Sequence, residues 1–513
     1  MKKLIVGAIL LTGLSAYAQE TYNNAIIATE DLNGTARYVG MGGAMEALGA
    51  DISTISTNPA GIGMFRRSQV SLSAGLVSQA NAAKSAYNDA TNASFDQIGG
   101  VWSQRVGRTS FLNIGFNYHK SRNFNNILGV EDALNGASQN KISYYKAFEG
   151  LYKVDKDFKG NSNMYSQVDY LYNRSLLIDK VDNKTYYYYE GDRYVMDKAQ
   201  KGYVGSYDFN VSGNVADRVY LGLTMGIKDV NYESYTSYYE LLQNNFGSVE
   251  LNDHSRITGS GFDVKLGAII FPIENSAFRI GASVSTPTFY DLNVSNYTTL
   301  ANRTIYGYGA NETVTSKESY DFKIFTPWKF GLSLGHTVNG TFALGASYEF
   351  ADYSSIRSRI INGTNYYGET SSYNDLAVNN DTKASLNGVH TLKLGAEYKL
   401  VPNWAVRIGY NFVSPIYKVE AFRSSAIDSP GTYYASTTDY VNWKATNRLT
   451  VGTGYSASNF AFDVAYQYSA TKGEFAPFMS YDDKSTAAAE CVPSVVNVNN
   501  NRHQLLATFT YKF

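Results

Sequence analysis

The stretch Phe460-Ala-Phe-Asp-Val-Ala-Tyr-Gln-Tyr-Ser469 alternates large apolar side chains with small or polar ones at every second position. Successive side chains of a β-strand point to opposite faces, so this pattern separates the aromatic residues from Asp463 and Gln467. The same alternation recurs in segments that begin at Phe278, Leu392 and Trp404, and in each segment the charges stay on one face. The pattern predicts a sheet with one apolar and one polar face.

Alternation alone fits a soluble β-sandwich as well as a membrane barrel, so the spacing of the strands has to decide. The chain offers about fourteen candidate strands by this criterion. They span 68–79, 96–106, 109–119, 203–214, 218–232, 255–272, 277–290, 320–337, 340–353, 388–400, 404–416, 446–457, 459–470 and 502–513.

The connections between these strands alternate between short and long. The long ones are 80–95, 120–202, 233–254, 291–319, 354–387, 417–445 and 471–501. Outer-membrane barrels have an even number of antiparallel strands, short periplasmic turns and long extracellular loops, whereas a sandwich has no reason to sort its loops by parity. The sequence therefore predicts an all-β fold, a 14-stranded antiparallel transmembrane β-barrel.

The last segment is suited to close such a barrel. One of its faces carries Leu505, Ala507, Phe509, Tyr511 and Phe513, and the chain ends on that aromatic residue. In hydrocarbon every backbone N–H and C=O needs a partner within the protein, so a sheet survives there only without free edges. We expect this segment to pair with the first strand.

The first 18 residues have the features of a secretory signal peptide. Lys2 and Lys3 precede an apolar run from Leu4 to Leu14, and Ala16-Tyr17-Ala18 gives a small-x-small cleavage site. The apolar run is too short to cross a membrane as a helix, and no other stretch is longer. We expect residues 1–18 to be removed on export and the mature protein to reside in the cell outer membrane.

Composition excludes several classes of function. The chain has 44 Tyr, 26 Phe and 44 Gly but only 9 Pro, and its net charge of −1 offers nothing to nucleic acid. The single Cys491 cannot form an internal disulfide, and the five histidines lack the spacing of metal ligands. We expect no enzyme activity, no cofactor and no metal.

Residues 19–67 show no strand alternation and are rich in Gly, small residues and turn formers. About 50 residues without a core of their own need a place to pack, and the lumen of a wide barrel is such a place. We therefore expect residues 19–67 to form a hatch, or plug, inside a barrel that spans residues 68–513.

Two motifs of this segment resemble a known family. Arg37-x-x-Gly-Met-Gly-Gly-Ala44 and Asn58-Pro59-Ala60-Gly61 are similar to the opening of FadL-type outer-membrane transporters of long-chain fatty acids and aromatic hydrocarbons (TodX-like). The resemblance implies a fourteen-stranded barrel and a hatch whose motif is Asn58, Pro59 and Ala60. It also implies passive uptake by hatch rearrangement and a lateral opening in the wall. The loop 120–202 is longer than in the family.

Loop 233–254 is the candidate outer ligand site. It carries Tyr238, Leu241, Leu242 and Phe246, whose spacing allows one apolar face of a helix. The resemblance places the outer groove of the family in the third and fourth extracellular loops, which supports this choice. The alternative is that these side chains only pack the loop against the barrel rim.

Three functions fit these observations. The first is passive uptake of hydrophobic small molecules by a monomer whose surroundings are outer-membrane lipid and lipopolysaccharide. The second is a surface receptor or adhesin that binds haem or glycans through its long loops. The third is a general porin, and the charged residues on the lumen face of the strands are compatible with this alternative.

Overall fold

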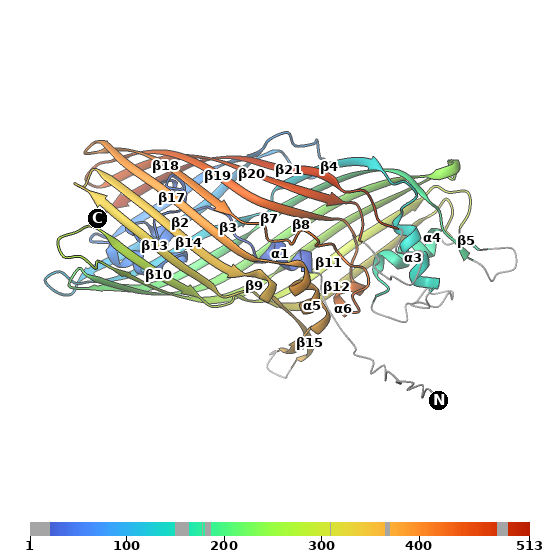
Figure 1. Ribbon diagram of the computed structural model, residues 1–513, viewed down its shortest axis with the longest axis horizontal. Coiled ribbons are helices and arrows are strands. Elements are labelled where there is room, and N and C mark those ends of the chain that lie inside the picture. Colours follow the sequence, from blue (N-terminus) through green and yellow to red (C-terminus); the bar gives the residue numbers. More distant parts are fainter. Residues whose placement is uncertain are drawn as a thin grey trace, which may run out of the picture.

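The computed structural model describes residues 21–148, 164–176, 178–179, 186–307, 309–364, 370–479 and 491–513. These residues form a closed antiparallel β-barrel with fourteen wall strands, and the C-terminus lies at the end that carries the short turns (Figure 1). The predicted fold class is confirmed. The predicted signal peptide, residues 1–18, lies outside the described residues.

Four of the wall strands are interrupted and carry two labels each. In chain order the wall consists of β1 (Gln69–Gln79), β2 (Thr91–Arg105), β3 (Phe111–Asn123) with β4 (Asn126–Ala133), β7 (Gly191–Val215), β8 (Val219–Leu242), β9 (Ser248–Ile270), β10 (Arg279–Ser285) with β11 (Phe289–Asn302), β12 (Thr313–Phe325) with β13 (Lys329–Val338), β14 (Phe342–Asp352) with β15 (Arg357–Thr364), β17 (Gly388–Val401), β18 (Trp404–Val413), β19 (Tyr440–Ser456), β20 (Phe460–Ala476) and β21 (Val496–Lys512).

The barrel closes where the sequence predicts. β21 pairs with β1 from Gln69↔Lys512 to Gln79↔Arg502, and no irregularity interrupts this ladder. On its other side β21 pairs with β20 along its whole length. The first and last strands therefore have no free edge toward lipid.

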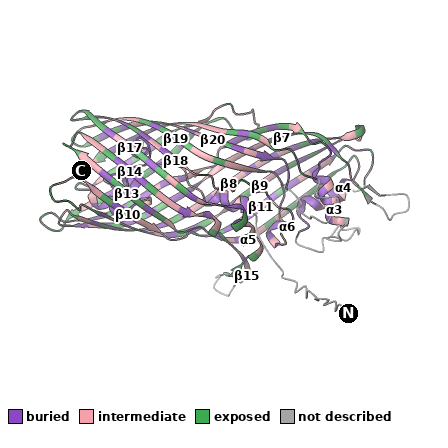
Figure 2. Ribbon diagram, viewed as in Figure 1, coloured by how far each residue is buried: buried purple, intermediate pink, exposed green. Residues whose placement is uncertain are grey.

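The two faces of the wall differ as the alternation predicts. On β20 the residue Phe462 is 49% exposed, whereas its neighbour Asp463 is 7% exposed and points into the lumen. Figure 2 shows the same alternation of exposed and buried positions along the strands of the wall. A closed sheet with an apolar outer band and a polar lumen is the architecture of an outer-membrane protein, so the predicted location is confirmed.

No helix among the described residues has the length and apolar character needed to cross a membrane.

Two neighbouring wall strands are interrupted by prolines. Pro287 separates β10 from β11, and Pro327 separates β12 from β13, because proline has no N–H to donate to a ladder. Threonines replace the missing bonds: Thr288 N donates to Thr326 Oγ1 (2.8 Å), and Thr326 N donates to the Thr288 carbonyl (3.1 Å). The predicted strands 277–290 and 320–337 are therefore interrupted, although the wall stays continuous.

Two of the predicted long loops are largely strand. β8 and β9 pair up to Leu241↔Ser248, so only a short turn with η3 (Gln243–Asn245) remains of the predicted loop 233–254. Likewise β11 and β12 pair as far as Ala301↔Thr313, within the predicted loop 291–319. Both predictions were wrong because these strand ends stand clear of lipid and carry polar residues on both faces.

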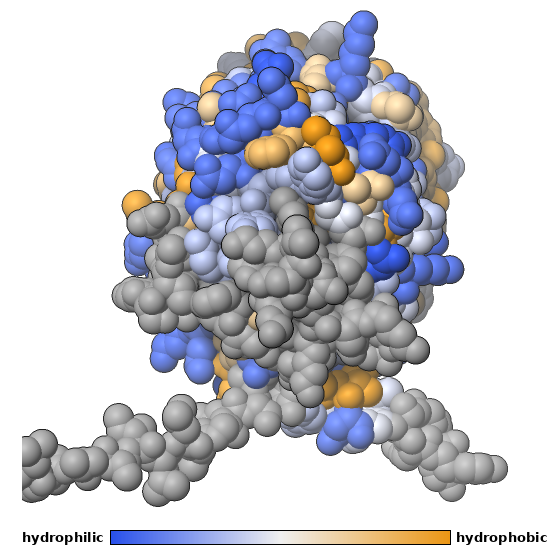
Figure 3. Space-filling model, turned by 90° about the vertical axis from the view of Figure 1, so that its right-hand side faces the viewer, coloured by the Kyte–Doolittle hydropathy of each residue, from blue (hydrophilic) through white to orange (hydrophobic). Residues whose placement is uncertain are grey.

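The remaining long connections fold into a cap over the extracellular end. Its elements are α3 (Gln139–Phe148), α4 (Gln167–Leu176), β5 (Ile178–Asp179), β6 (Tyr186–Tyr187), η4 (Tyr353–Ser355), β16 (Thr370–Asn374), α5 (Leu376–Ser385) and α6 (Pro430–Tyr433). α3 and α4 come from the predicted loop 120–202 and share a buried apolar core with the ends of β7, β8 and β9. Viewed end-on, the described part of this face is mainly hydrophilic (Figure 3).

The lipid-facing wall gives a first prediction. Leu394 lies midway along the outward face of β17 and is 43% exposed, so Leu394→Arg places a charge in the middle of the hydrocarbon. We expect the free energy of unfolding in phospholipid vesicles to fall by about 2–4 kcal/mol. Leu400→Arg, at the end of the same strand, is the matched control and should cost about 0–1 kcal/mol. Equal losses would contradict the assignment of this face to lipid.

The cap gives a second prediction. Asp375 caps α5 by accepting a hydrogen bond from Val378 N (3.3 Å), and burial raises the pKa of its carboxyl to about 8. The folded state therefore holds a proton that the unfolded state releases near pH 4. The stability of the docked helix falls as pH rises from about 4 to about 8, and then levels off.

Hydrogen exchange measures this effect directly. The α5 amides should have lower protection factors at pH 8 than at pH 5, and Asp375→Asn should remove the difference while keeping the cap. If the pH dependence persists in Asp375→Asn, another group is responsible for it.

Candidate functional site

The N-terminal segment occupies the lumen of the barrel. It contains α1 (Thr21–Ala28), α2 (Ala36–Gly40), η1 (Ile52–Ser56) and η2 (Pro59–Met64), and α1 is seen within the outline of the wall in Figure 1. Residues of α1 pack against inward-facing residues of β8, β9 and β11. We call residues 21–34 the arm and residues 35–64 the foot of the hatch.

Each short helix of the foot begins at a side chain that caps it. Thr35 accepts a hydrogen bond from Tyr38 N, Asp51 from Ser53 N, and Asn58 from Ala60 N. Such caps supply acceptors for amides that have no partner within a helix, and Pro59 fits the first position of η2 because it has no N–H there. The sequence thus folds the foot into short helices without a core of its own.

The predicted hatch motif joins the foot to the wall. Asn58 Nδ2 donates to the Ala268 carbonyl of β9 (3.3 Å), and the Pro59 carbonyl accepts from Asn210 Nδ2 of β7 (3.4 Å). Ala60 is fully buried in a small cluster with wall residues of β8 and β9. These three residues therefore have a structural role as an anchor between foot and wall.

Ion pairs tie both parts of the hatch to the wall. In the foot, Arg37 donates two hydrogen bonds to Glu397, and Glu46 lies 2.6 Å from Lys393 Nζ. In the arm, Glu30 lies 2.6 Å from Lys329 Nζ. Buried charges need partners, and the buried carboxylates Glu46 and Glu397 each have one, as does the more exposed Glu30.

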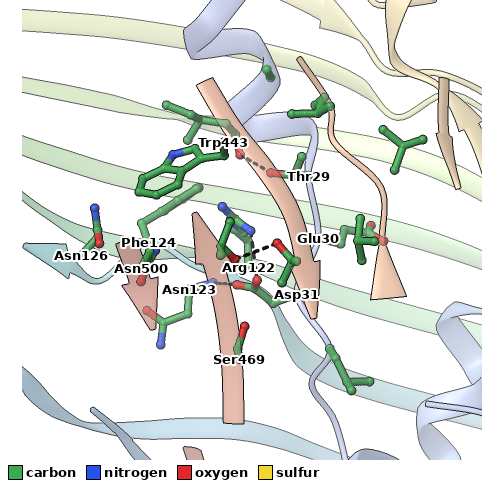
Figure 4. Close-up of a pocket in the computed structure, with 18 of the residues that line it drawn as sticks. Thr29, Glu30, Asp31, Arg122, Asn123, Phe124, Asn126, Trp443, Ser469 and Asn500 are labelled. Atoms are coloured by element: carbon green, nitrogen blue, oxygen red, sulfur yellow. Dashed lines mark hydrogen bonds and ion pairs between the residues drawn. The ribbon is translucent and has the colours of Figure 1, made fainter. Parts of the chain in front are cut away.

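A cavity of about 290 Å³ lies between the arm and the wall, on the extracellular side of the foot (Figure 4). Part of its lining is apolar and largely aromatic. These residues are Tyr22, Ile26, Phe124, Val389, Val413, Ile416, Tyr417, Tyr440 and Trp443. Tyr22 of the arm stacks on Tyr417 with ring centroids 4.9 Å apart, so the arm forms one side of this apolar surface.

The rest of the lining has an excess of positive charge. Among the described residues, eight cationic side chains and four carboxylates line it, and two of the cations, Lys393 and Lys444, also pair with Glu46 and Glu474 outside the lining. The cations are Arg122, Lys198, Lys329, Lys393, Arg423, Lys444, Arg448 and Arg502, and the carboxylates are Glu30, Asp31, Glu349 and Asp439. The cavity is therefore suited to an anionic group.

The excess is greatest around Asp31 of the arm. Its carboxylate lies 2.9 Å from Arg122, 3.5 Å from Arg448 and 4.0 Å from Arg502, measured to the nearest nitrogen. Figure 4 shows Arg122 directed at Asp31, and the Arg122 Nε atom is buried without a hydrogen-bond acceptor. One carboxylate cannot satisfy three guanidinium groups, so this cluster can accept a second anion.

The predicted outer ligand residues lie elsewhere. Tyr238 and Leu242 are buried in the core of the cap, where Tyr238 donates to Glu240 (3.1 Å). Leu241 is half-buried on the opposite face of β8, and Phe246 contacts Tyr189 at the turn. They do not form one helical face, and none of the four lines the cavity. Their contact with ligand stays a prediction.

The cluster of Arg122, Arg448 and Arg502 was not predicted from the sequence. Arg448 and Arg502 lie near the middle of β19 and β21 and point into the lumen, so the alternation of these strands was the signal that could have identified them. Arg122 was hidden in the predicted loop 120–202, because β3 runs on to Asn123. Among the described residues, no group of three or more His, Cys, Asp or Glu side chains is placed to hold a metal ion.

Comparison with known proteins bears on the fold. No family model and no curated protein sequence matches the chain. Among solved structures, a FadL homologue of Pseudomonas aeruginosa is 12% identical, with a TM-score of 0.50 over 95% of this chain and all of that one. The Ralstonia pickettii toluene transporter TbuX is 13% identical, with a TM-score of 0.48 over 94% of this chain and 99% of that one.

The Pseudomonas putida toluene transporter TodX is 12% identical, with a TM-score of 0.46 over 94% of this chain and 99% of that one. At these identities a likeness speaks to fold and not to ligand. The FadL-type architecture that the N-terminal motifs suggest is thus confirmed: the chain has the fold of the Pseudomonas aeruginosa FadL homologue.

Proposed function

We propose that this barrel takes up hydrophobic small molecules passively, and that its preferred ligands carry a carboxylate on a long apolar chain. The observation that carries this proposal is the cavity beside the arm, which has an aromatic surface on one side and, on the other, three guanidinium groups that share one carboxylate. A neutral hydrocarbon would use only the first of these surfaces.

The apolar surface suits the tail of such a ligand. Tyr22, Phe124 and Trp443 present large side chains to the cavity, and burying an alkyl chain against them releases water from both. The tail would displace no ion pair there. This surface supports a long-chain ligand whether or not it is charged.

The arginine cluster suits the head. A carboxylate near Arg122, Arg448 and Arg502 would give the cluster the second anion that it lacks and would compete with Asp31 for them. Because Asp31 belongs to the arm, this competition would loosen the arm from the wall. Ligand binding and hatch rearrangement are then one event.

The route out of the cavity passes through the wall in this proposal. β2 pairs with β3 only from Gln97↔His119 to Arg105↔Phe111, so the extracellular ends of the two strands, residues 91–96 and 120–123, are unpaired with each other. A second, smaller cavity of about 40 Å³ extends from Asp31 toward Asp96 and Lys120 at this separation. These features support a lateral exit between β2 and β3.

Uptake of labelled oleate by cells that express the protein tests the proposal. Removing charge with Arg122→Gln and Arg502→Gln together should weaken uptake by about 10-fold or more, because a hydrogen bond between charged groups contributes about 1.5–3 kcal/mol. Uptake of labelled toluene should be unaffected.

Arg67→Gln is the matched control, since Arg67 donates to the Ser458 carbonyl at the periplasmic rim, far from the cavity lining. Unchanged oleate uptake in the folded double variant would contradict the proposed carboxylate site. Loss of oleate and toluene uptake together would indicate a role of the arginines in the hatch alone.

The cap separates uptake from the receptor alternative. Replacing residues 139–176 by a Gly-Ser linker removes α3 and α4 from the mouth of the barrel. A transporter should keep its oleate uptake, because the cavity lining contains no residue of either helix. A receptor that binds haem or glycans through this loop should lose that binding in the linker variant. The receptor alternative would be favoured if the variant loses haem or glycan binding and the parent protein takes up no oleate.

A further inference from the structure

Glycines face the lumen around most of the wall, where the foot packs against it. They lie on β2, β3, β8, β9, β10, β13, β14, β17, β18 and β19, and the neighbours of each include hatch atoms. We call this set the glycine collar: Gly99, Gly115, Gly222, Gly267, Gly281, Gly335, Gly345, Gly395, Gly409 and Gly452. Glycine weakens a strand, so its recurrence on ten strands beside the foot needs a reason.

The reason is direct contact between the wall and the backbone of the foot. A Cβ atom on Gly345 would lie 1.9 Å from the Ala44 carbonyl oxygen, and one on Gly395 would lie 2.3 Å from the Met41 carbonyl oxygen. On Gly222 it would lie 2.4 Å from the Pro59 carbonyl carbon. In all three cases the nearest atoms belong to the foot, so no side chain fits without moving it.

Four collar glycines form a continuous row. Gly335, Gly345, Gly395 and Gly409 pair directly across β13, β14, β17 and β18. The sequence Met41-Gly-Gly-Ala44 of the foot lies against this row, with Gly42 N approaching Gly409. Its own glycines, Gly42 and Gly43, have positive φ values of 63° and 81°, which lets the chain turn within the narrow space.

The arm is held in a different way. No described collar glycine has an arm atom among its nearest neighbours, and the arm meets the wall instead through ion pairs, side-chain hydrogen bonds and apolar packing. Close packing of backbone on backbone resists displacement at every contact, whereas an ion pair can be exchanged for another ion. The two parts of the hatch should therefore differ in mobility.

We infer that the glycine collar is a fitted seat that keeps the foot in place during transport and confines rearrangement to the arm. The seat itself is independent of what the protein carries; only the role of the arm rests on the proposed function. The foot then remains a permanent barrier between the cavity and the periplasm.

Alanine substitutions in the collar test the seat. Gly345→Ala and Gly395→Ala should displace the foot and give steady ion conductance in planar bilayers, where the parent protein should show a closed baseline. Gly115→Ala is the matched control, because Cβ there would lie at ordinary distances of 3.4 Å from Ile55 and 3.5 Å from Ile62. It should stay closed.

Heat-modifiable migration in gels verifies that each variant is folded. Folded Gly345→Ala and Gly395→Ala proteins that stay closed would overturn the seat, as would equal conductance in Gly115→Ala. If both collar variants fail to fold, Gly222→Ala, whose nearest atoms also belong to the foot, provides the same test on β8.

Hydrogen exchange of the full-length protein with and without oleate tests the division of the hatch. Amides of residues 21–34 should exchange faster with oleate, and those of residues 35–64 should not change. Loss of protection in the foot would overturn the inference. If oleate changes neither part while the collar variants conduct, the seat stands and the proposed ligand fails.

Discussion

The structure depends on one constraint: no backbone polar group can face hydrocarbon without a partner. This constraint forces β21 onto β1 and turns the sheet into a closed wall. Closure with fourteen strands leaves a lumen too wide for wall side chains alone to fill. The hatch, the buried ion pairs and the cavity beside the arm are all consequences of that lumen, because something polar has to occupy it without opening a pore.

The lumen is filled in two ways that divide the hatch. Around the foot, glycines on eight strands let the backbone of the wall meet the backbone of the foot, and the caps at Thr35, Asp51 and Asn58 fold the foot into its short helices. Around the arm, charged side chains fill the lumen, and near Asp31 three guanidinium groups share one carboxylate. Tight packing suits a barrier, whereas exchangeable charge suits a binding site, and the two lie next to each other along one short segment.

The sequence was sufficient for the fold because its signals are local. Alternation such as that along Phe460–Ser469 depends only on neighbouring residues, and together with the spacing of the strands it predicts the barrel and its closure. The absence of alternation in residues 19–67 predicts the plug. Strand ends beyond the membrane were missed, since both faces there mix apolar and polar residues: Tyr238 and Glu240 lie on the inward face, and Ser237 and Tyr239 on the outward face. The cavity was missed for another reason: Asp31, Arg122 and Arg502 are far apart in the chain and meet only through strand register. The collar glycines are present in the sequence, but their common contact with the foot could not be predicted without the strand register.

The central claim is that a long apolar chain with a carboxylate binds in the cavity beside the arm. The most direct measurement is a crystal structure of the protein soaked with palmitate brominated at its terminal carbon, with bromine located by anomalous scattering. The account predicts bromine among Tyr22, Phe124 and Trp443, and carboxylate density near Arg122. Bromine found only on the outer wall, with the cavity holding nothing but solvent, would contradict it.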